Sequence, residues 1–153
     1  MSSLYLALKF LHVVGVIFWI GGITAMTIWT VRAGSDPDRR SLAVTLRHAL
    51  FYGQRVVGPS SGVVLLAGIA MVIQAKIGFG TLWIVWGLAG ILIHFILGFT
   101  VLSKNGQRLA QIAESGTPDP GALDQVLRRQ KTVATIYVLI MLGVVWAMVT
   151  KPT

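Results

Sequence analysis

Four apolar stretches, each about 20 residues long or longer, constrain the fold of this chain more than any other feature. They run over residues 4–31, 56–75, 81–102 and 132–150. A helix of that length crosses the ~30 Å hydrocarbon core of a bilayer and satisfies its own backbone polar groups. The sequence therefore predicts an all-α integral membrane four-helix bundle, formed as a single domain by residues 1–153.

Composition agrees with a membrane protein and excludes several functions. Hydrophobic residues make up 55 % of the chain and charged residues only 12 %, whereas charged residues reach about 25 % in soluble domains. The net charge of +8 suits membrane loops, and no basic run interleaved with aromatic residues suggests a nucleic-acid surface. Because the chain has no cysteine, disulfides and thiolate metal sites are excluded.

The lysines and arginines predict which way the bundle faces. Of the 13 in the chain, all but Lys9, Lys76 and Lys151 fall in the connections between the first and second spans and between the third and fourth. By the positive-inside rule, these two connections are cytoplasmic and both termini lie outside. We expect a bacterial inner (plasma) membrane protein whose arginines contact anionic lipids at the cytoplasmic face.

Both cytoplasmic connections have helical character. Ser35-Asp36-Pro37 is typical of an N-cap followed by proline, and it predicts an amphipathic helix over about 37–54. Leu42, Leu46 and Leu50 share one face of that helix. Pro59 then predicts a kink where this helix joins the second span.

The third and fourth spans outrun the bilayer. Helical character continues after Leu102 to Gly116, and Asp119-Pro120 begins the next helix. The helix from Thr81 to Glu114 is predicted to be about 50 Å long, longer than the ~30 Å core. Helical extensions are therefore expected on the cytoplasmic side.

Two histidines inside the spans are the main candidates for chemistry. Ionisable residues in a membrane span are costly and usually face the bundle interior. His12 is about 12 Å from the start of the first span and His94 about 18 Å from the start of the third, so both are predicted at one level in the outer half of the bilayer. Two imidazoles at one level can ligate a haem b iron from both faces. His48 lies on the cytoplasmic side and is expected to be solvated or in contact with lipid headgroups.

Small residues leave room for such a cofactor. Gly90 and Gly98 lie one turn before and one turn after His94, and Gly15 follows His12. Lys9, one turn outward of His12, is placed to pair with a haem propionate.

Less specific interpretations remain open for each of these residues. Glycines spaced by four let membrane helices approach closely, His12 can hydrogen-bond across helices, Lys9 can snorkel, and Trp19 can be a packing or interfacial aromatic residue. One histidine could ligate with a different partner or another metal. Thioethers suit Cu(I), but the methionines in the spans form no close pair (Met26, Met71, Met141 and Met148). Since the spans hold no Asp or Glu, acid–base catalysis is not expected, and an enzyme of this composition would be an oxidoreductase.

The first span resembles known membrane families. Lys9, His12, Trp19 and Gly22, in the pattern Lys-x-x-His-x6-Trp-x-x-Gly, are similar to the opening helix of the copper-resistance D (CopD-like) proteins and of predicted integral membrane relatives. The pattern resembles, more distantly, that of HemJ-type protoporphyrinogen oxidases. The resemblance implies a four-span layout, with His12 as the cofactor residue and Lys9 and Trp19 beside it.

The sequence thus predicts a b-type haem protein with His12 and His94 as axial ligands. Its expected role is electron transfer or redox support, with a periplasmic partner or a membrane quinone, alone, self-associated or within a larger membrane complex. The alternatives are a structural or accessory subunit without a cofactor, a protoporphyrinogen oxidase and a copper-handling protein.

Overall fold

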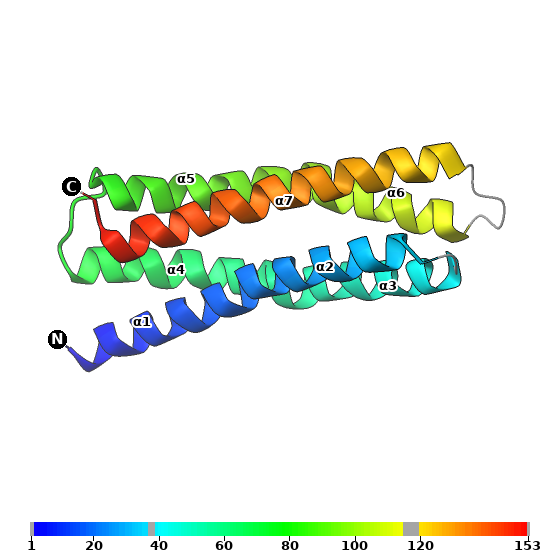
Figure 1. Cartoon of the computed structure of the whole chain (residues 1–153). Helices are drawn as coiled ribbons and strands as arrows, with labels where there is room; N and C mark the ends of the chain where they lie inside the picture. The colour runs from blue at the N-terminus through cyan, green and yellow to red at the C-terminus, as the bar shows by residue number, and fades with distance from the viewer. Residues whose placement is uncertain (1, 37–38, 115–119, 153) are drawn as a thin grey trace.

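The structure is a bundle of four long antiparallel helical rods with both termini at the same end (Figure 1). It is a computed structural model that describes residues 2–36, 39–114 and 120–152. The first rod comprises α1 (Ser3–Val16), η1 (Ile17–Gly21) and α2 (Gly22–Gly34). The second comprises α3 (Arg39–Tyr52), η2 (Gly53–Val57) and α4 (Gly58–Gln74). The third comprises α5 (Leu82–Ile96), η3 (Leu97–Leu102) and α6 (Ser103–Glu114), and the fourth is α7 (Pro120–Thr150).

Each rod is long and apolar enough to cross a membrane, which confirms the predicted fold class. The segments that meet this criterion are Ser3–Gly34, Ser41–Gln74, Leu82–Ile112 and Gly121–Thr150. Only 22 to 28 % of each apolar window is buried inside the bundle. Many large hydrophobic side chains, such as Phe10, Leu66 and Trp146, are instead exposed on the bundle, as they would be toward lipid.

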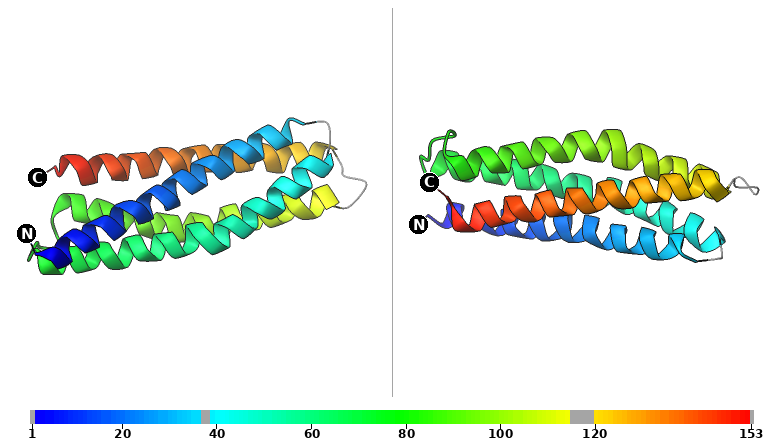
Figure 2. Two further views of the ribbon diagram at one scale, coloured as in Figure 1. Left: turned by 90° about the horizontal axis from the view of Figure 1, so that it is seen from below. Right: turned by 45° about the horizontal axis from the view of Figure 1, so that its top comes forward.

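Each rod packs on particular neighbouring rods, and the first rod crosses the bundle obliquely (Figure 2). At the end that holds the termini, α1 packs on α4 and α5 packs on α7. Toward the other end, α2 packs on α3 and α7, and α6 packs on α3 and α7. The first rod therefore packs on the second rod along its whole length and on α7 only in its second half.

Two hydrophobic clusters hold these contacts together. The first lies in the middle of the rods and comprises Trp19, Ile23, Val57, Val64, Ile91, Tyr137 and Met141. The second joins the ends of α2, α3, α6 and α7 and comprises Ala33, Leu42, Leu46, Leu109, Leu123 and Val126. Burial of Leu42 and Leu46 in the second cluster gives α3 the apolar face expected from the sequence.

The segment before α3 differs from the sequence prediction, and the predicted kink at Pro59 stays a prediction. Ser35 is the C-cap of α2 and not the N-cap of the next helix, whereas Pro37 lies outside the described residues. Pro59 falls in the first turn of α4, directly after the π-helical turn η2, and the helix from Ser41 to Gln74 continues through it. A π turn shifts the hydrogen-bonding register, so the missing N–H of proline does not end the helix. Of the predicted boundaries after α6, Gly116 and Asp119 also lie outside the described residues.

Close approach of α5 and α7 depends on Gly90. A Cβ atom at Gly90 would lie 2.6 Å from Val144 Cγ2 and 3.4 Å from Val144 Cβ. The valine side chain is stiff, so Gly90→Ala should force α5 and α7 apart and destabilise the protein by about 1–2 kcal/mol. Thermal unfolding of purified protein in detergent measures the change. Gly143→Ala on α7 is the control, because nothing lies within 4 Å of its Cβ position, and equal unfolding curves for the two variants would contradict this packing.

Candidate functional site: a buried histidine beside an apolar cavity

His94 forms a buried polar cluster with Trp19 and Tyr137 in the middle of the bundle. Trp19 Nε1 donates to His94 Nδ1 at 3.1 Å and to Tyr137 Oη at 3.2 Å. His94 Nδ1 and Tyr137 Oη are 2.6 Å apart, and the Trp19 and His94 rings meet edge to face at 4.7 Å. The three residues come from η1, α5 and α7 and are at most 6 % exposed. The cluster thus ties three rods together around one imidazole.

The hydrogen bonds permit two tautomers of His94. With the proton on Nδ1, the imidazole donates to the Tyr137 oxygen, which also accepts from Trp19, and the lone pair of Nε2 stays unused. With the proton on Nε2, both Trp19 and Tyr137 donate to the single lone pair of Nδ1. Among the described residues, the structure shows hydrogen bonds for Nδ1 and none for Nε2. The first tautomer leaves Nε2 able to ligate a metal.

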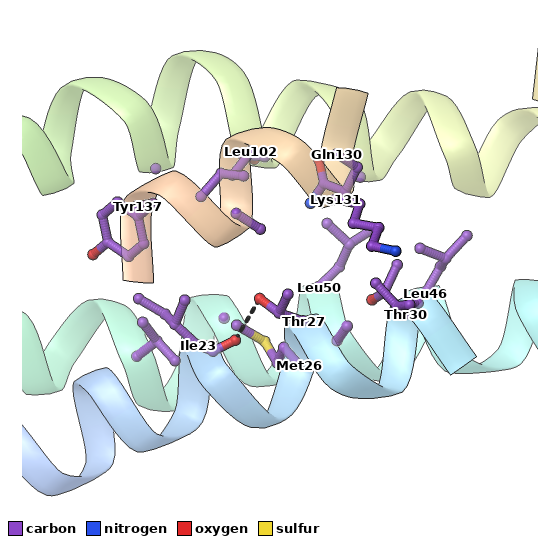
Figure 3. A pocket seen from close by; sticks show the side chains of 18 of the residues that line it. Ile23, Met26, Thr27, Thr30, Leu46, Leu50, Leu102, Gln130, Lys131 and Tyr137 are labelled. Carbon is purple, nitrogen blue, oxygen red and sulfur yellow. Dashed lines mark hydrogen bonds between the residues drawn. The ribbon is translucent and has the colours of Figure 1, made fainter. Parts of the chain in front are cut away.

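A cavity of about 670 Å³ adjoins this cluster (Figure 3), within the range of 300–1,000 Å³ usual for ligand sites. Its walls come from α2, α3, η2, the end of α5, η3, the start of α6 and α7. His94, Gly98, Tyr137 and Ile23 line it toward the middle of the bundle. Thr30, Leu46 and Lys131 line the opposite end, and Figure 3 shows them well separated from Tyr137. The cavity therefore runs from the bundle centre toward the ends of α3 and α6.

The cavity wall is mostly apolar. Ile23, Val57, Leu50 and Leu102 contribute to it, and residues of both hydrophobic clusters line it. The hydroxyl of Thr27 faces the same space, but it donates to the Ile23 carbonyl at 2.8 Å, the bond drawn in Figure 3. The histidine end and the charged end are thus separated by an apolar middle.

π-helical turns contribute to the cluster and to the cavity. Trp19 lies in η1, while η2 and η3 supply Gly53, Gly98 and other lining residues. Such turns are rare and occur frequently at functional sites. Each one rotates the following helix relative to the preceding one, so the register of three rods changes at the level of the cavity.

His12 lies elsewhere, and the structure does not bring it together with His94. Its Nδ1 is 2.9 Å from the Val64 carbonyl oxygen, and a Cβ at Gly68 would be 3.2 Å from its Cε1. His12 therefore packs on α4. Trp19, which contacts His94, is seven residues further along, about 10 Å by helical rise. The predicted shared level is not observed, because the first rod crosses the bundle obliquely and this face of α1 meets α4.

The other predicted site residues divide between helix packing and the cavity. Gly98 lines the cavity, and a Cβ there would lie 3.7 Å from the His94 ring. Gly15 instead packs on α4, with Val64 Cγ2 only 2.8 Å from its Cβ position, and Gly90 packs on Val144. Lys9 is exposed on α1 and is not among the lining residues. Gly15 and Gly90 are both packed between helices, so neither leaves room for a cofactor.

Sequence reasoning missed Tyr137 and the cavity itself. A tyrosine in an apolar span looks like a packing residue, and only its contact with Trp19 and His94 shows its polar role. The one available signal was that a buried phenol usually has a hydrogen-bond partner, which would have directed attention to the histidines.

The metal alternatives find less support in the geometry. Among the described residues there is no group of three or more His, Asp or Glu that could hold a metal ion. Met26 lines the cavity, Met141 is packed in the first hydrophobic cluster, and Met148 lies against Gly87. These three methionines occupy different environments.

Comparison with known proteins gives one match. Residues 6–152 match a family described as predicted integral membrane protein (DUF2269). The comparisons with curated proteins and with solved structures give no match.

Proposed function

The chain belongs to this DUF2269 family of integral membrane proteins, and we propose that it binds b-type haem in the apolar cavity, where His94 would ligate the iron. The observation that carries the proposal is His94 itself, 6 % exposed on the cavity wall, with Nδ1 within hydrogen-bond distance of Tyr137 Oη. Bound haem would supply reversible one-electron chemistry at iron.

The residues around His94 suit a haem ligand. A histidine that ligates a metal through Nε2 almost always donates its Nδ1–H to a nearby acceptor, which fixes the ring and raises the basicity of the ligand. Tyr137 Oη, 2.6 Å from Nδ1, can accept that proton, and Trp19 holds the phenol in place at 3.2 Å. These contacts orient the imidazole without occupying Nε2.

The space beside the ring also suits a flat group. Gly98, one turn after His94, carries no side chain into the cavity, so no side chain from this position covers the Cε1–Nδ1 edge of the imidazole. The apolar walls would exclude water from the macrocycle, which favours the binding of an apolar ring. The residues present therefore fit haem at this site with one histidine from the chain.

The position of the cavity bears on the redox partner. His94 lies twelve residues from the start of α5, about 18 Å into the membrane span, so the site is deep in the bundle. A lipid-soluble carrier such as a quinone, or another membrane subunit, reaches that depth more readily than a soluble periplasmic protein. We therefore assign the role to electron transfer or redox support within the membrane.

Haem titration of the purified protein in a neutral detergent tests the proposal. We expect a Soret band that saturates at one haem per chain and responds to dithionite reduction. A structural role for the Trp19–His94–Tyr137 cluster is the second candidate, favoured by the mutual hydrogen bonds of its three residues. Under that role, haem partitions into the micelles without saturation and His94 affects stability alone.

A further inference from the structure

Lys131 is a cation that faces an apolar cavity. It lines the cavity from α7, and Figure 3 shows its ammonium group extending toward Thr30 of α2 and Leu46 of α3. Within the described residues, the structure shows no ion pair or hydrogen bond for the Lys131 side chain. Lys131 is exposed, so water hydrates its ammonium group and no protein group occupies it. Lys131 is therefore available to an acidic group of a ligand.

The other charged residues of the lining largely offset each other. Asp124 and Arg128 also line the cavity near its Lys131 end. They are four residues apart on α7, so their opposite charges lie one helical turn from each other. The charges of Asp124 and Arg128 sum to zero, so the net positive charge at this end of the cavity equals that of Lys131.

The spacing along α7 matches a ligand with two different ends. Tyr137 marks the histidine end and Lys131 the charged end, six residues away, or about 9 Å by helical rise. That separation is comparable to the distance between the iron of a haem and its propionate carboxylates. The apolar middle of the cavity lies between the two positions.

We propose that Lys131 binds the carboxylate end of the cavity ligand, so that the site selects apolar ring acids held with the acid toward α3 and α6. The inference rests on the proposed function and deepens it by naming what the cavity recognises besides the metal. It reverses the orientation expected from the sequence, in which Lys9 receives the propionates. Lys9 is exposed on α1, at the end that holds the termini, and is not among the cavity residues.

Binding of haem and of its dimethyl ester distinguishes the two lysines. The ester keeps the iron and the macrocycle but carries no carboxylate, so it loses only the contact with a cation. We expect the wild type to bind haem about 10- to 100-fold more tightly than the ester, the effect of a charge-assisted hydrogen bond. Lys131→Met should abolish this preference by weakening haem binding alone. Lys131→Arg should retain the preference, and Lys9→Met, the matched control, should behave as the wild type.

The outcomes separate this inference from the proposed function. If the wild type binds both porphyrins equally and Lys131→Met changes neither affinity, the haem site stands and the role of Lys131 is overturned. Loss of the preference in Lys9→Met but not in Lys131→Met overturns it as well, in favour of the opposite orientation. If the wild type binds neither porphyrin, the proposed function fails and this inference fails with it. Because Lys131 is exposed, its replacement should leave thermal unfolding unchanged, which verifies that the variant is folded.

Discussion

Replacing His94 with alanine is expected to abolish saturable haem binding, with a loss of affinity of at least about tenfold, since even residues that only support a ligand contribute 10- to 100-fold. His94 is the one histidine among the residues that line the described cavity. Trp19 and Tyr137 can still bond each other at 3.2 Å in the variant, so the fold should persist. Optical titration of the variant in detergent measures the effect.

Two comparisons make this result specific. In His94→Gly, added imidazole should restore the Soret band, because the cavity left by the side chain can hold the free ligand. His12→Ala should leave the spectrum unchanged, since His12 packs on Val64 and Gly68 of α4. Loss of the band in His12→Ala would instead support the pair of axial histidines predicted from the sequence, and unchanged binding in His94→Ala would remove the ligand assignment.

Filling the cavity beside His94 is expected to have the second large effect. A Cβ at Gly98 would meet the His94 ring at 3.7 Å, an ordinary van der Waals contact, so Gly98→Ala should fold and bind haem nearly as the wild type does. Gly98→Leu would place a branched side chain in the space next to the imidazole. We expect haem affinity to fall by at least about tenfold while the helical content stays constant, because overfilling a site costs about 1–3 kcal/mol.

A substitution of the same size on an outward face provides the control. Gly143 is exposed on α7, and nothing lies within 4 Å of its Cβ position. Gly143→Leu should therefore leave haem titration and circular dichroism unchanged. If Gly98→Leu binds haem as tightly as Gly143→Leu, the ligand does not occupy the space next to His94.

The fold was predictable because it depends mainly on the apolar spans, and each span can be recognised from its own segment of the sequence. Length and hydropathy alone identify the four spans, and they require no knowledge of which faces meet. The apolar positions Leu42 and Leu46 likewise gave the buried face of α3 from their spacing alone. Which side of the membrane each end faces stays a prediction from the distribution of Lys and Arg.

The site was harder to predict, because it depends on rotation and inclination of the helices. Depth counted from the start of each span placed His12 beside His94, but the face of α1 that carries His12 meets α4. The π turns η1, η2 and η3 change the register at the level of the cavity, and nothing in the composition of those segments reveals them. The same uncertainty hid Tyr137, whose role depends on contacts more than 40 residues away in sequence.

An experimental structure of the haem-loaded protein tests the central claim most directly, with the iron located by its anomalous scattering. The account predicts iron at coordination distance from Nε2 of His94, inside the cavity lined by Gly98 and Tyr137, with the propionates toward Lys131. Iron beside His12 at the contact of α1 with α4, or no iron within the bundle, would contradict it.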